Sequence, residues 1–241
     1  MRRFTKKPLI IAHRGGTHRA PENSLDAFVD AIEAGADMVE FDLRQTKDKA
    51  LVAYHDPLVQ GTRVSDLTLA EMRASLGGQR GLAPTFEEII AATRGRIGLD
   101  IELKEDGFEK RVLDLVLGHF DLCELLITSF SPSTLATVRA VCPEMPTGLA
   151  IGRMRGWMYP SELCSVHRAH RLGVSAIVPN YRLADLGLAT RAWMRQLLVY
   201  VWTVNDERLL SRLIRDPQIT GIITDVPDLA VSLRDRHTSE G

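Results

Sequence analysis

The sequence contains few aromatic residues and almost no net charge. Aromatic side chains make up 6% of the 241 residues, which argues against a platform on which single-stranded nucleic acid could stack. Lys and Arg together number 30, against 31 Asp and Glu, so no field of one sign attracts nucleic acid. We therefore expect no nucleic-acid partner.

Cysteines and long apolar runs are also scarce. Cys123, Cys142 and Cys164 are odd in number and widely spaced, which indicates neither a disulfide framework nor a zinc-binding spacing. Reduced thiols are typical of the cytoplasm, the location we expect. No apolar run approaches the length of a membrane span. The basic first seven residues precede an apolar run that ends at Ala12, too soon for a signal peptide.

Short apolar runs, many of them β-branched, alternate with stretches of helical periodicity. The runs predict buried strands at residues 8–12, 38–43, 97–103, 125–128, 147–151, 175–178, 198–204 and 219–223. Helices between consecutive strands imply parallel strands with right-handed crossovers. Eight such units in one chain of this length predict an α/β fold, a (β/α)8 TIM barrel. We expect residues 1–241 to form a single domain, with residues 235–241 as a frayed tail.

Capping residues mark where the helices are expected to begin. Asn23 or Ser24 precedes the first helix, and later starts are predicted at Thr68, Pro84-Thr85, Pro132, Ser161, Asp206 and Pro227. An open doubly wound sheet is the alternative to the barrel. The first turn after a strand, His13-Arg14-Gly15-Gly16, lacks the glycine pattern of the dinucleotide-binding loop, which favours the barrel.

The most informative stretch covers residues 38–56. If its first part is a strand, Glu40 and Asp42 point to one face, while Val39 and Phe41 cover the other. Paired carboxylates repel each other unless a cation or a proton intervenes. A second apolar run then ends at His55. The pattern indicates a hard-metal site with an acid or base beside it.

Further candidates follow other predicted strands, where a barrel carries its active site. They are His13, Glu102, Trp202 and Asp225. Each also has an ordinary structural interpretation: a loop histidine, an interior ion pair of Glu102 with Lys104, a core tryptophan and a helix start. For Asp225 we favour the helix start. The gathering of these residues at one rim favours a functional site for the others.

Eight stretches of the sequence resemble the glycerophosphodiester phosphodiesterase family, in the family's order and over most of the chain. They are His13-Arg14-Gly15, Ala20-Pro21-Glu22-Asn23-Ser24, Glu40-Phe41-Asp42, His55-Asp56, Ile101-Glu102-Leu103-Lys104, Ser129-Phe130, Trp202-Thr203-Val204-Asn205 and Ile223-Thr224-Asp225-Val226-Pro227. Each stretch alone is a weak signal, whereas the ordered set is specific. The barrel, divalent metal and phosphodiester substrate of that family agree with the interpretation of the residues themselves.

The resemblance implies a role for each matching residue. Glu40, Asp42 and Glu102 would hold a divalent metal, Mg²⁺ or Ca²⁺, and carboxylate oxygens suit such hard cations. His13 and His55 would act as the general acid–base pair.

The remaining matches imply contacts with the substrate. Arg14 and Lys104 would bind phosphate oxygens, the first as a planar fork and the second as a point charge. Trp202 would form an apolar wall beside the leaving alcohol. Glu22 would contact the site residues and not the substrate itself.

The implied reaction is hydrolysis of a glycerophosphodiester to glycerol 3-phosphate and an alcohol, through a cyclic phosphate. Lysophospholipase D-like action on an acylated diester is an alternative, and an apolar groove at the barrel mouth would favour it. A catalytically silent barrel that binds phosphorylated ligands is another, favoured by loss of a histidine or metal ligand, but none is missing. The released alcohol, the metal, the order of the histidines and the oligomeric state stay open.

One segment departs from the family. The family commonly follows its His-Asp pair with a longer segment that bears an Arg-Thr pair, whereas this chain has Pro57-Leu58-Val59-Gln60-Gly61-Thr62-Arg63 and a short connection. Such a segment would line the pocket, so the departure bears on the preferred head group.

Overall fold

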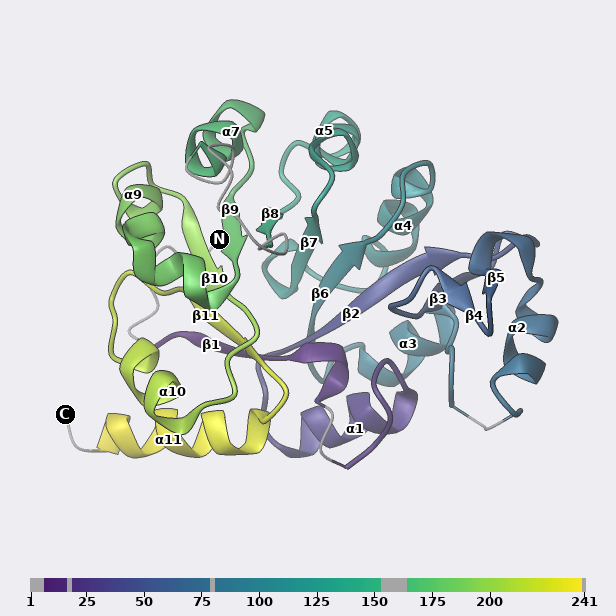
Figure 1. Cartoon of the computed structure of the whole chain (residues 1–241), viewed down its shortest axis with the longest axis horizontal. Helices are drawn as coiled ribbons and strands as arrows, with labels where there is room; N and C mark the ends of the chain where they lie inside the picture. The colour runs from purple at the N-terminus through teal and green to yellow at the C-terminus, as the bar shows by residue number, and fades with distance from the viewer. Residues whose placement is uncertain (1–6, 17–18, 79–80, 153–163, 240–241) are drawn as a thin grey trace.

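Parallel strands close into a barrel at the centre of the molecule (Figure 1). The computed structural model describes residues 7–16, 19–78, 81–152 and 164–239. The barrel strands are β1 (Leu9–Ala12), β2 (Met38–Gln45), β6 (Gly98–Leu103), β7 (Leu125–Ser129), β8 (Thr147–Ile151), β9 (Ala176–Pro179), β10 (Leu198–Val201) and β11 (Gly221–Thr224). Strand β1 pairs in parallel with both β11 and β2, which closes the ring. The predicted TIM barrel is confirmed.

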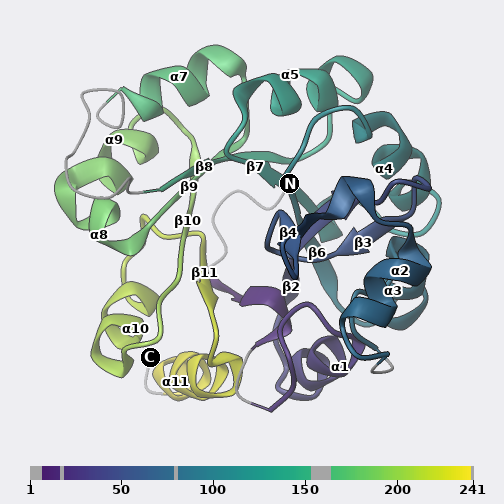
Figure 2. The same cartoon turned by 45° about the vertical axis from the view of Figure 1, so that its right-hand side comes forward.

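Helices surround the strands on the outside (Figure 2). They are α1 (Leu25–Glu33), α3 (Phe86–Thr93), α4 (Glu109–Val116), α5 (Pro132–Val141), α7 (Ser165–Leu172), α8 (Tyr181–Leu183), α9 (Ala189–Trp193), α10 (Glu207–Ile214) and α11 (Pro227–Ser239). The predicted caps Ser24, Thr68, Thr85 and Asp206 each accept a main-chain hydrogen bond from the first turn of their helix, which satisfies an otherwise unpaired donor. Ser161 lies outside the described residues.

The chain makes an excursion between β2 and β6 before the barrel continues. Strand β3 (Leu51–Ala53) runs back antiparallel to the end of β2, which forms a hairpin before His55. The next residues form a small hairpin, β4 (Leu58–Val59) with β5 (Thr62–Arg63), followed by η2 (Val64–Asp66) and α2 (Leu69–Ser75). A separate apolar cluster that includes Val59 and Met72 supports this excursion.

Side chains alternate between the barrel interior and the layer under the helices. On β2, the ring of Phe41 packs against Phe28 of α1 and Phe86 of α3, at centroid distances of 5.7 and 6.0 Å. Its neighbours Glu40 and Asp42 therefore face inward. The interior also holds an apolar cluster drawn from six strands: Ile11, Met38, Leu126, Ala176, Val178, Tyr200 and Ile223. The carboxylates thus enter an interior that is otherwise largely apolar.

Two helix ends differ from the prediction. The helical periodicity of Leu188, Trp193 and Leu197 predicts a helix that reaches Leu197, but α9 ends at Trp193, because Gln196 adopts a φ of 59° and turns the chain into β10. Helix α11 continues to Ser239, through residues expected to fray. Arg234 of this helix pairs with Asp37 and so ties it to the barrel. None of the described helices combines the length and hydropathy that a membrane crossing requires.

Candidate active site

Three carboxylates meet inside the barrel on β2 and β6. In the parallel pairing of these strands, Glu40 lies opposite Asp100, and Asp42 lies opposite Glu102. Because alternate side chains share a face, this register brings the carboxylates together. One oxygen from each of Glu40, Asp42 and Glu102 lies within 4.8 Å of the others. Oxygen donors gathered in this way are the ligands that a hard divalent cation prefers.

The carboxylates differ in how readily they ionise. Burial raises the pKa of Glu40 well above its ordinary value, and the charges of Asp42 and Glu102 raise it further. Burial also opposes ionisation of Asp42, but Lys104 and Arg14 outweigh it and hold the pKa of that carboxyl low. Burial raises the pKa of Glu102 against the charge of Lys104. Carboxylates outnumber cations here, so the residues present fit a bound divalent metal.

The loop after β1 carries Arg14 to the edge of this cluster. Arg14 has a φ of 51°, and its main-chain N–H donates to Oε2 of Glu40 at 3.0 Å. Its Nε lies 3.1 Å from Oδ2 of Asp42, and its Nη1 donates to Oε2 of the half-exposed Glu22 at 2.8 Å. Gly15 follows with a φ of 90°, where a Cβ would come within 2.6 Å of a helix α1 side chain. This turn therefore requires glycine.

Asp42 is held from several sides. Lys104, just after β6, places Nζ 2.8 Å from Oδ1 of Asp42 and 2.5 Å from Oε1 of Glu102. Asn23 donates from Nδ2 to Oδ2 of Asp42 at 3.0 Å, and its Oδ1 accepts from the Asp42 main-chain N–H at 3.2 Å. Of the two predicted caps, Ser24 begins α1, which leaves Asn23 to fix the orientation of the carboxylate.

The two histidines approach the carboxylates from different loops. Nε2 of His13 lies 3.9 Å from Oε2 of Glu40, and its ring is largely buried. His55 follows β3 and is more exposed, with Nδ1 2.8 Å from Oδ1 of Asp56. Its charge lowers the pKa of Glu102, although burial, which raises that pKa, is the larger effect. Both imidazoles therefore lie at the rim where the carboxylates gather.

Phe130 and Trp202 form an aromatic wall beside Lys104. The rings of Phe130 and Trp202 meet edge to face with their centroids 5.8 Å apart, and Nζ of Lys104 lies 5.9 Å from the centroid of Phe130. Trp202 is fixed by a hydrogen bond from Nε1 to the carbonyl oxygen of Val178 at 2.8 Å. A Cβ on Gly152 would come within 3.0 Å of the Phe130 ring, so glycine leaves room beside this wall.

Asp225 lies just before α11, as expected for a helix start, and it also contacts a candidate catalytic residue. Its Oδ1 lies 2.7 Å from Nδ1 of His13, and its Oδ2 accepts from Nδ2 of Asn205 at 2.6 Å. Oδ1 of Asn205 in turn accepts from the Asp225 main-chain N–H at 2.9 Å and from Oγ1 of Thr224 at 3.1 Å. Asp225 therefore does more than precede a helix: its carboxylate orients an imidazole.

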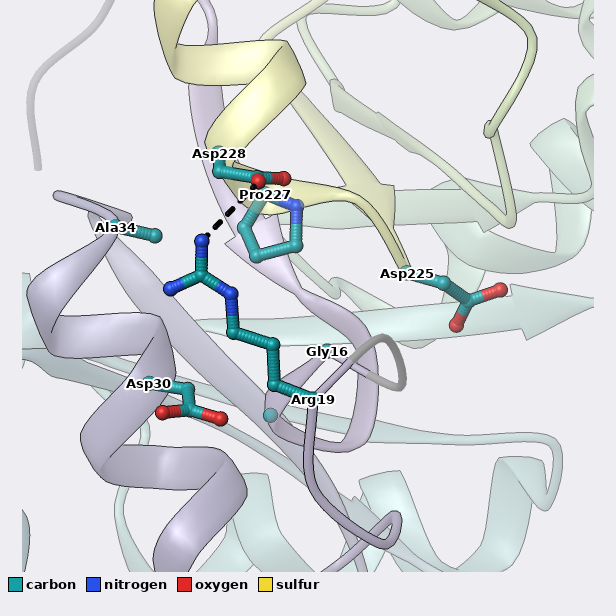
Figure 3. Close-up of a pocket in the computed structure, with 8 residues that line it drawn as sticks. Gly16, Arg19, Asp30, Ala34, Asp225, Pro227 and Asp228 are labelled. Atoms are coloured by element: carbon teal, nitrogen blue, oxygen red, sulfur yellow. Dashed lines mark ion pairs between the residues drawn. The ribbon is translucent and has the colours of Figure 1, made fainter.

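A shallow pocket lies beside Asp225, between the loop after β1, helix α1 and the start of α11 (Figure 3). Arg19 extends across it toward Asp228, at 3.9 Å, whereas the Asp225 carboxylate points away from Arg19. The described residues that line this pocket include Asp225, but none of the three clustered carboxylates and neither candidate histidine. It is therefore separate from the carboxylate cluster.

Comparison with known proteins identifies the family. A family model described as the glycerophosphoryl diester phosphodiesterase family matches residues 13–229. The chain belongs to this family.

Relatives of this family match nearly end to end. The glycerophosphodiester phosphodiesterase of Caldanaerobacter subterraneus subsp. tengcongensis is 29% identical over 94% of this chain and 98% of its own. The crystal structure of the glycerophosphodiester phosphodiesterase from Thermotoga maritima superposes with a TM-score of 0.79 at 25% identity, over 94% of this chain and 98% of the other. An Oleispira antarctica phosphodiesterase, solved with its product sn-glycerol-3-phosphate, has a TM-score of 0.77 at 24% identity and covers 95% and 98% of the two chains.

The structure gathers all the predicted site residues of this phosphodiesterase-family chain at one rim. Glu40, Asp42, Glu102, Arg14, Lys104, His13, His55, Trp202 and Glu22 all lie there, and Glu22 reaches the carboxylates through Arg14. Asn23, Asn205 and Phe130 join them without having been predicted as site residues. A signal for them existed, because each stands inside a stretch that carries the family resemblance.

Proposed function

We propose that this chain is a metal-dependent hydrolase that cleaves glycerophosphodiesters into glycerol 3-phosphate and an alcohol. The observation that carries the proposal is the meeting of Glu40, Asp42 and Glu102 within 4.8 Å, with two imidazoles and two cationic side chains beside them. Membership of the phosphodiesterase family supports the same reaction class. We further propose that residues 1–241 act as one domain.

The carboxylates are the proposed metal ligands. When bound, Mg²⁺ or Ca²⁺ would be held by Glu40, Asp42 and Glu102 and would supply positive charge for the phosphoryl oxygens. Lys104 and Arg14 now face Asp42, so each can also turn a donor toward a phosphate oxygen at the rim. Fixed positive groups of this kind lower the barrier because negative charge develops on those oxygens during the reaction.

The histidines carry the proposed proton transfers. One imidazole removes the proton from the glycerol hydroxyl next to the ester, and that oxygen attacks phosphorus. The other imidazole gives a proton to the departing alcohol oxygen as the bond from phosphorus to that oxygen breaks. Water then opens the cyclic phosphate with the two roles exchanged. His13 and His55 are the residues we assign to these steps.

The aromatic wall is the proposed contact for the alcohol side of the substrate. Trp202 and Phe130 form an aromatic surface beside Lys104, so a group attached to the bound phosphate would lie against them. An acylated diester could use the same surface, and this observation supports lysophospholipase D-like action as the second candidate. The complete set of carboxylates and histidines argues against a catalytically silent barrel.

A substrate panel tests the proposal. Purified protein is stripped of metal, resupplied with Mg²⁺ or Ca²⁺, and assayed against glycerophosphodiesters that differ in the alcohol and against one lysophospholipid. We expect release of glycerol 3-phosphate only with metal present. If the lysophospholipid releases its free alcohol faster than the glycerophosphodiesters release theirs, lysophospholipase D-like action would be favoured. No turnover of any diester with either metal would contradict the proposal.

A further inference from the structure

Arg44 is a buried cation on β2 whose donors converge on the loop that carries His55. Its side chain is 9% exposed and follows Asp42 by two residues, so both lie on the inner face. Nε and Nη2 both donate to the main-chain carbonyl oxygen of His55, at 3.1 and 2.8 Å. Nη1 lies 2.5 Å from Oε1 of Glu105.

The His55 carbonyl oxygen, which accepts both hydrogen bonds from Arg44, lies in a stretch between strands. Strand β3 ends at Ala53 and β4 begins at Leu58, so sheet pairing does not fix the main chain at His55. The preceding residue, Tyr54, donates its main-chain N–H to the carbonyl oxygen of Asp42 at 2.8 Å. The Arg44 fork is a second tie to β2, one residue further along, and it acts at the histidine itself.

Glu105 anchors the other side of the guanidinium. It follows Lys104 directly, and its Oε2 also accepts from the main-chain N–H of Gln45 at 3.5 Å. Arg44 therefore connects three segments of the rim: β2 with its carboxylates, the loop with His55 and the loop after β6. A planar fork with several donors can hold such a junction, whereas a lysine ammonium cannot match its geometry.

We propose that Arg44 is a positioning residue for His55, an inference that rests on the proposed function of that histidine. The guanidinium holds the His55 main chain so that the imidazole stands at the correct distance from the phosphorus and the oxygens of the substrate. Misplacement of a catalytic group by about 1 Å can cost about a hundredfold in rate. The carboxylate on the other side of the fork keeps the guanidinium from turning away.

Burial of a cation for packing alone is costly. A guanidinium loses hydration in the barrel wall, and an apolar side chain of similar length would fill the space without that cost. The arrangement is therefore better explained by the geometry that it imposes on His55. Because Arg44 makes contact through a main-chain oxygen, substitution of the imidazole leaves the fork intact, which allows the two effects to be separated.

The chain offers a matched control. Arg73 of α2 has the same arrangement, with Nε and Nη2 3.4 and 3.3 Å from the carbonyl oxygen of Ala83 and Nη2 2.5 Å from Oε2 of Glu88. It supports the excursion between β2 and β6 and contacts none of the site residues among its described partners. Substitution of Arg73 removes the same kind of interaction without reaching His55.

The test is a double-mutant cycle of Arg44→Met and His55→Ala on glycerophosphodiester turnover. We expect Arg44→Met to lower kcat by about tenfold to a hundredfold, with KM changed little, since the histidine acts in the transition state. In the His55→Ala background, the same substitution should cost less than about twofold, because the residues act as a unit. Arg73→Met should leave kcat unchanged.

Two further measurements keep the result interpretable. Glu105→Gln preserves the shape of the side chain that anchors Arg44. It should also lower kcat, again only when His55 is present. The proposal is therefore testable even if Arg44→Met does not fold. Metal titration of the variants should give unchanged affinity. An affinity loss as large as the activity loss would mean that Arg44 acts through Asp42 and would overturn the proposal.

The outcomes separate this inference from the proposed function. If His55→Ala lowers activity but the Arg44 effect is undiminished in that background, Arg44 does not position the histidine, and the role of His55 stands. If Arg44→Met and Glu105→Gln both keep the wild-type kcat, Arg44 likewise does not position the histidine. If His55→Ala keeps full activity, the assigned role of His55 fails, and the positioning role fails with it.

Discussion

Nδ1 of His13 lies 2.7 Å from Oδ1 of Asp225, although 212 residues separate them in the chain. The closure of the barrel brings them together, since β1 and β11 pair in parallel with Ala12 opposite Thr224. The residue that follows each strand therefore reaches the same point of the rim. A carboxylate at Nδ1 favours the tautomer in which that nitrogen carries the proton, and it leaves Nε2 facing the carboxylate cluster.

Asp225→Asn should lower kcat by about tenfold to a thousandfold while the protein stays folded. The amide keeps the size of the side chain but removes the charge that orients and stabilises a protonated imidazole. Steady-state kinetics on a glycerophosphodiester, with a melting temperature as the check on folding, measures the effect. Asp228→Asn changes an exposed carboxylate three residues further on and should have no effect. Equal rates for the two variants would contradict the role of Asp225.

The sequence predicted the barrel because its strands are short apolar runs. The run at residues 147–151 has the same bounds as β8, and the predicted pairing of strands then brought Glu102 of β6 beside Asp42 of β2. The β4–β5 hairpin was missed, since each strand has only two residues and the second is exposed. Such short strands carry no period.

The contacts missed at the site have a different cause. Asp225-Val226-Pro227 satisfies the signature of a helix start whether or not the carboxylate meets a histidine, so local sequence does not decide between the two. The partner of Arg44 is a main-chain oxygen, and every residue has one. A sequence pattern therefore cannot identify that partner, and only the register of the strands and the path of the loop do.

Asp100→Asn should stabilise the metal-free protein more at alkaline than at acidic pH. Burial raises the pKa of Asp100 to about 8, although the hydrogen bond from Thr128 favours ionisation. Between the ordinary pKa of 3.8 and this value, the folded state keeps a proton that the unfolded state has released. The free energy of unfolding therefore falls as pH rises through this window, by at most about 1.4 kcal/mol per pH unit.

The asparagine side chain does not ionise, so the variant lacks this loss. Its oxygen can still accept the hydrogen bond that Thr128 now donates at 3.0 Å. Denaturant unfolding of both proteins at about pH 5, 6, 7 and 8 should give a stability difference that grows in favour of the variant. A difference that stays constant over this range would show that Asp100 ionises normally in the folded protein.

Glu102→Gln should abolish turnover at limiting metal without unfolding the barrel. Glutamine keeps the shape of the side chain but removes one of the charges that the cation requires. Metal titration followed by activity assays at each concentration measures the loss. In the wild-type protein, metal should also raise the melting temperature, because a ligand that binds only the folded state stabilises it. Near-normal activity of the variant at limiting metal would exclude Glu102 as a ligand.

His13→Ala and His55→Ala should each lower the rate on glycerophosphodiesters by about a hundredfold to ten-thousandfold, the usual contribution of a positioned acid or base. Metal affinity should change little, because the proposed ligands are carboxylates. His167→Ala removes an exposed imidazole on α7 and serves as the matched control with unchanged rate. Full activity of either site variant would remove that histidine from the mechanism.

A substrate with a very good leaving group separates the two roles. A nitrophenyl phosphodiester that retains the neighbouring hydroxyl still needs a base to start the attack, but its departing oxygen needs little help from an acid. The variant that lacks the acid should therefore recover most of its rate on this substrate, whereas the variant that lacks the base should recover little. The different supports of the two imidazoles, a carboxylate at Nδ1 of His13 and a main-chain tie at His55, make an unequal division of labour reasonable. Equal recovery by both variants would mean that the separate acid and base roles are wrong.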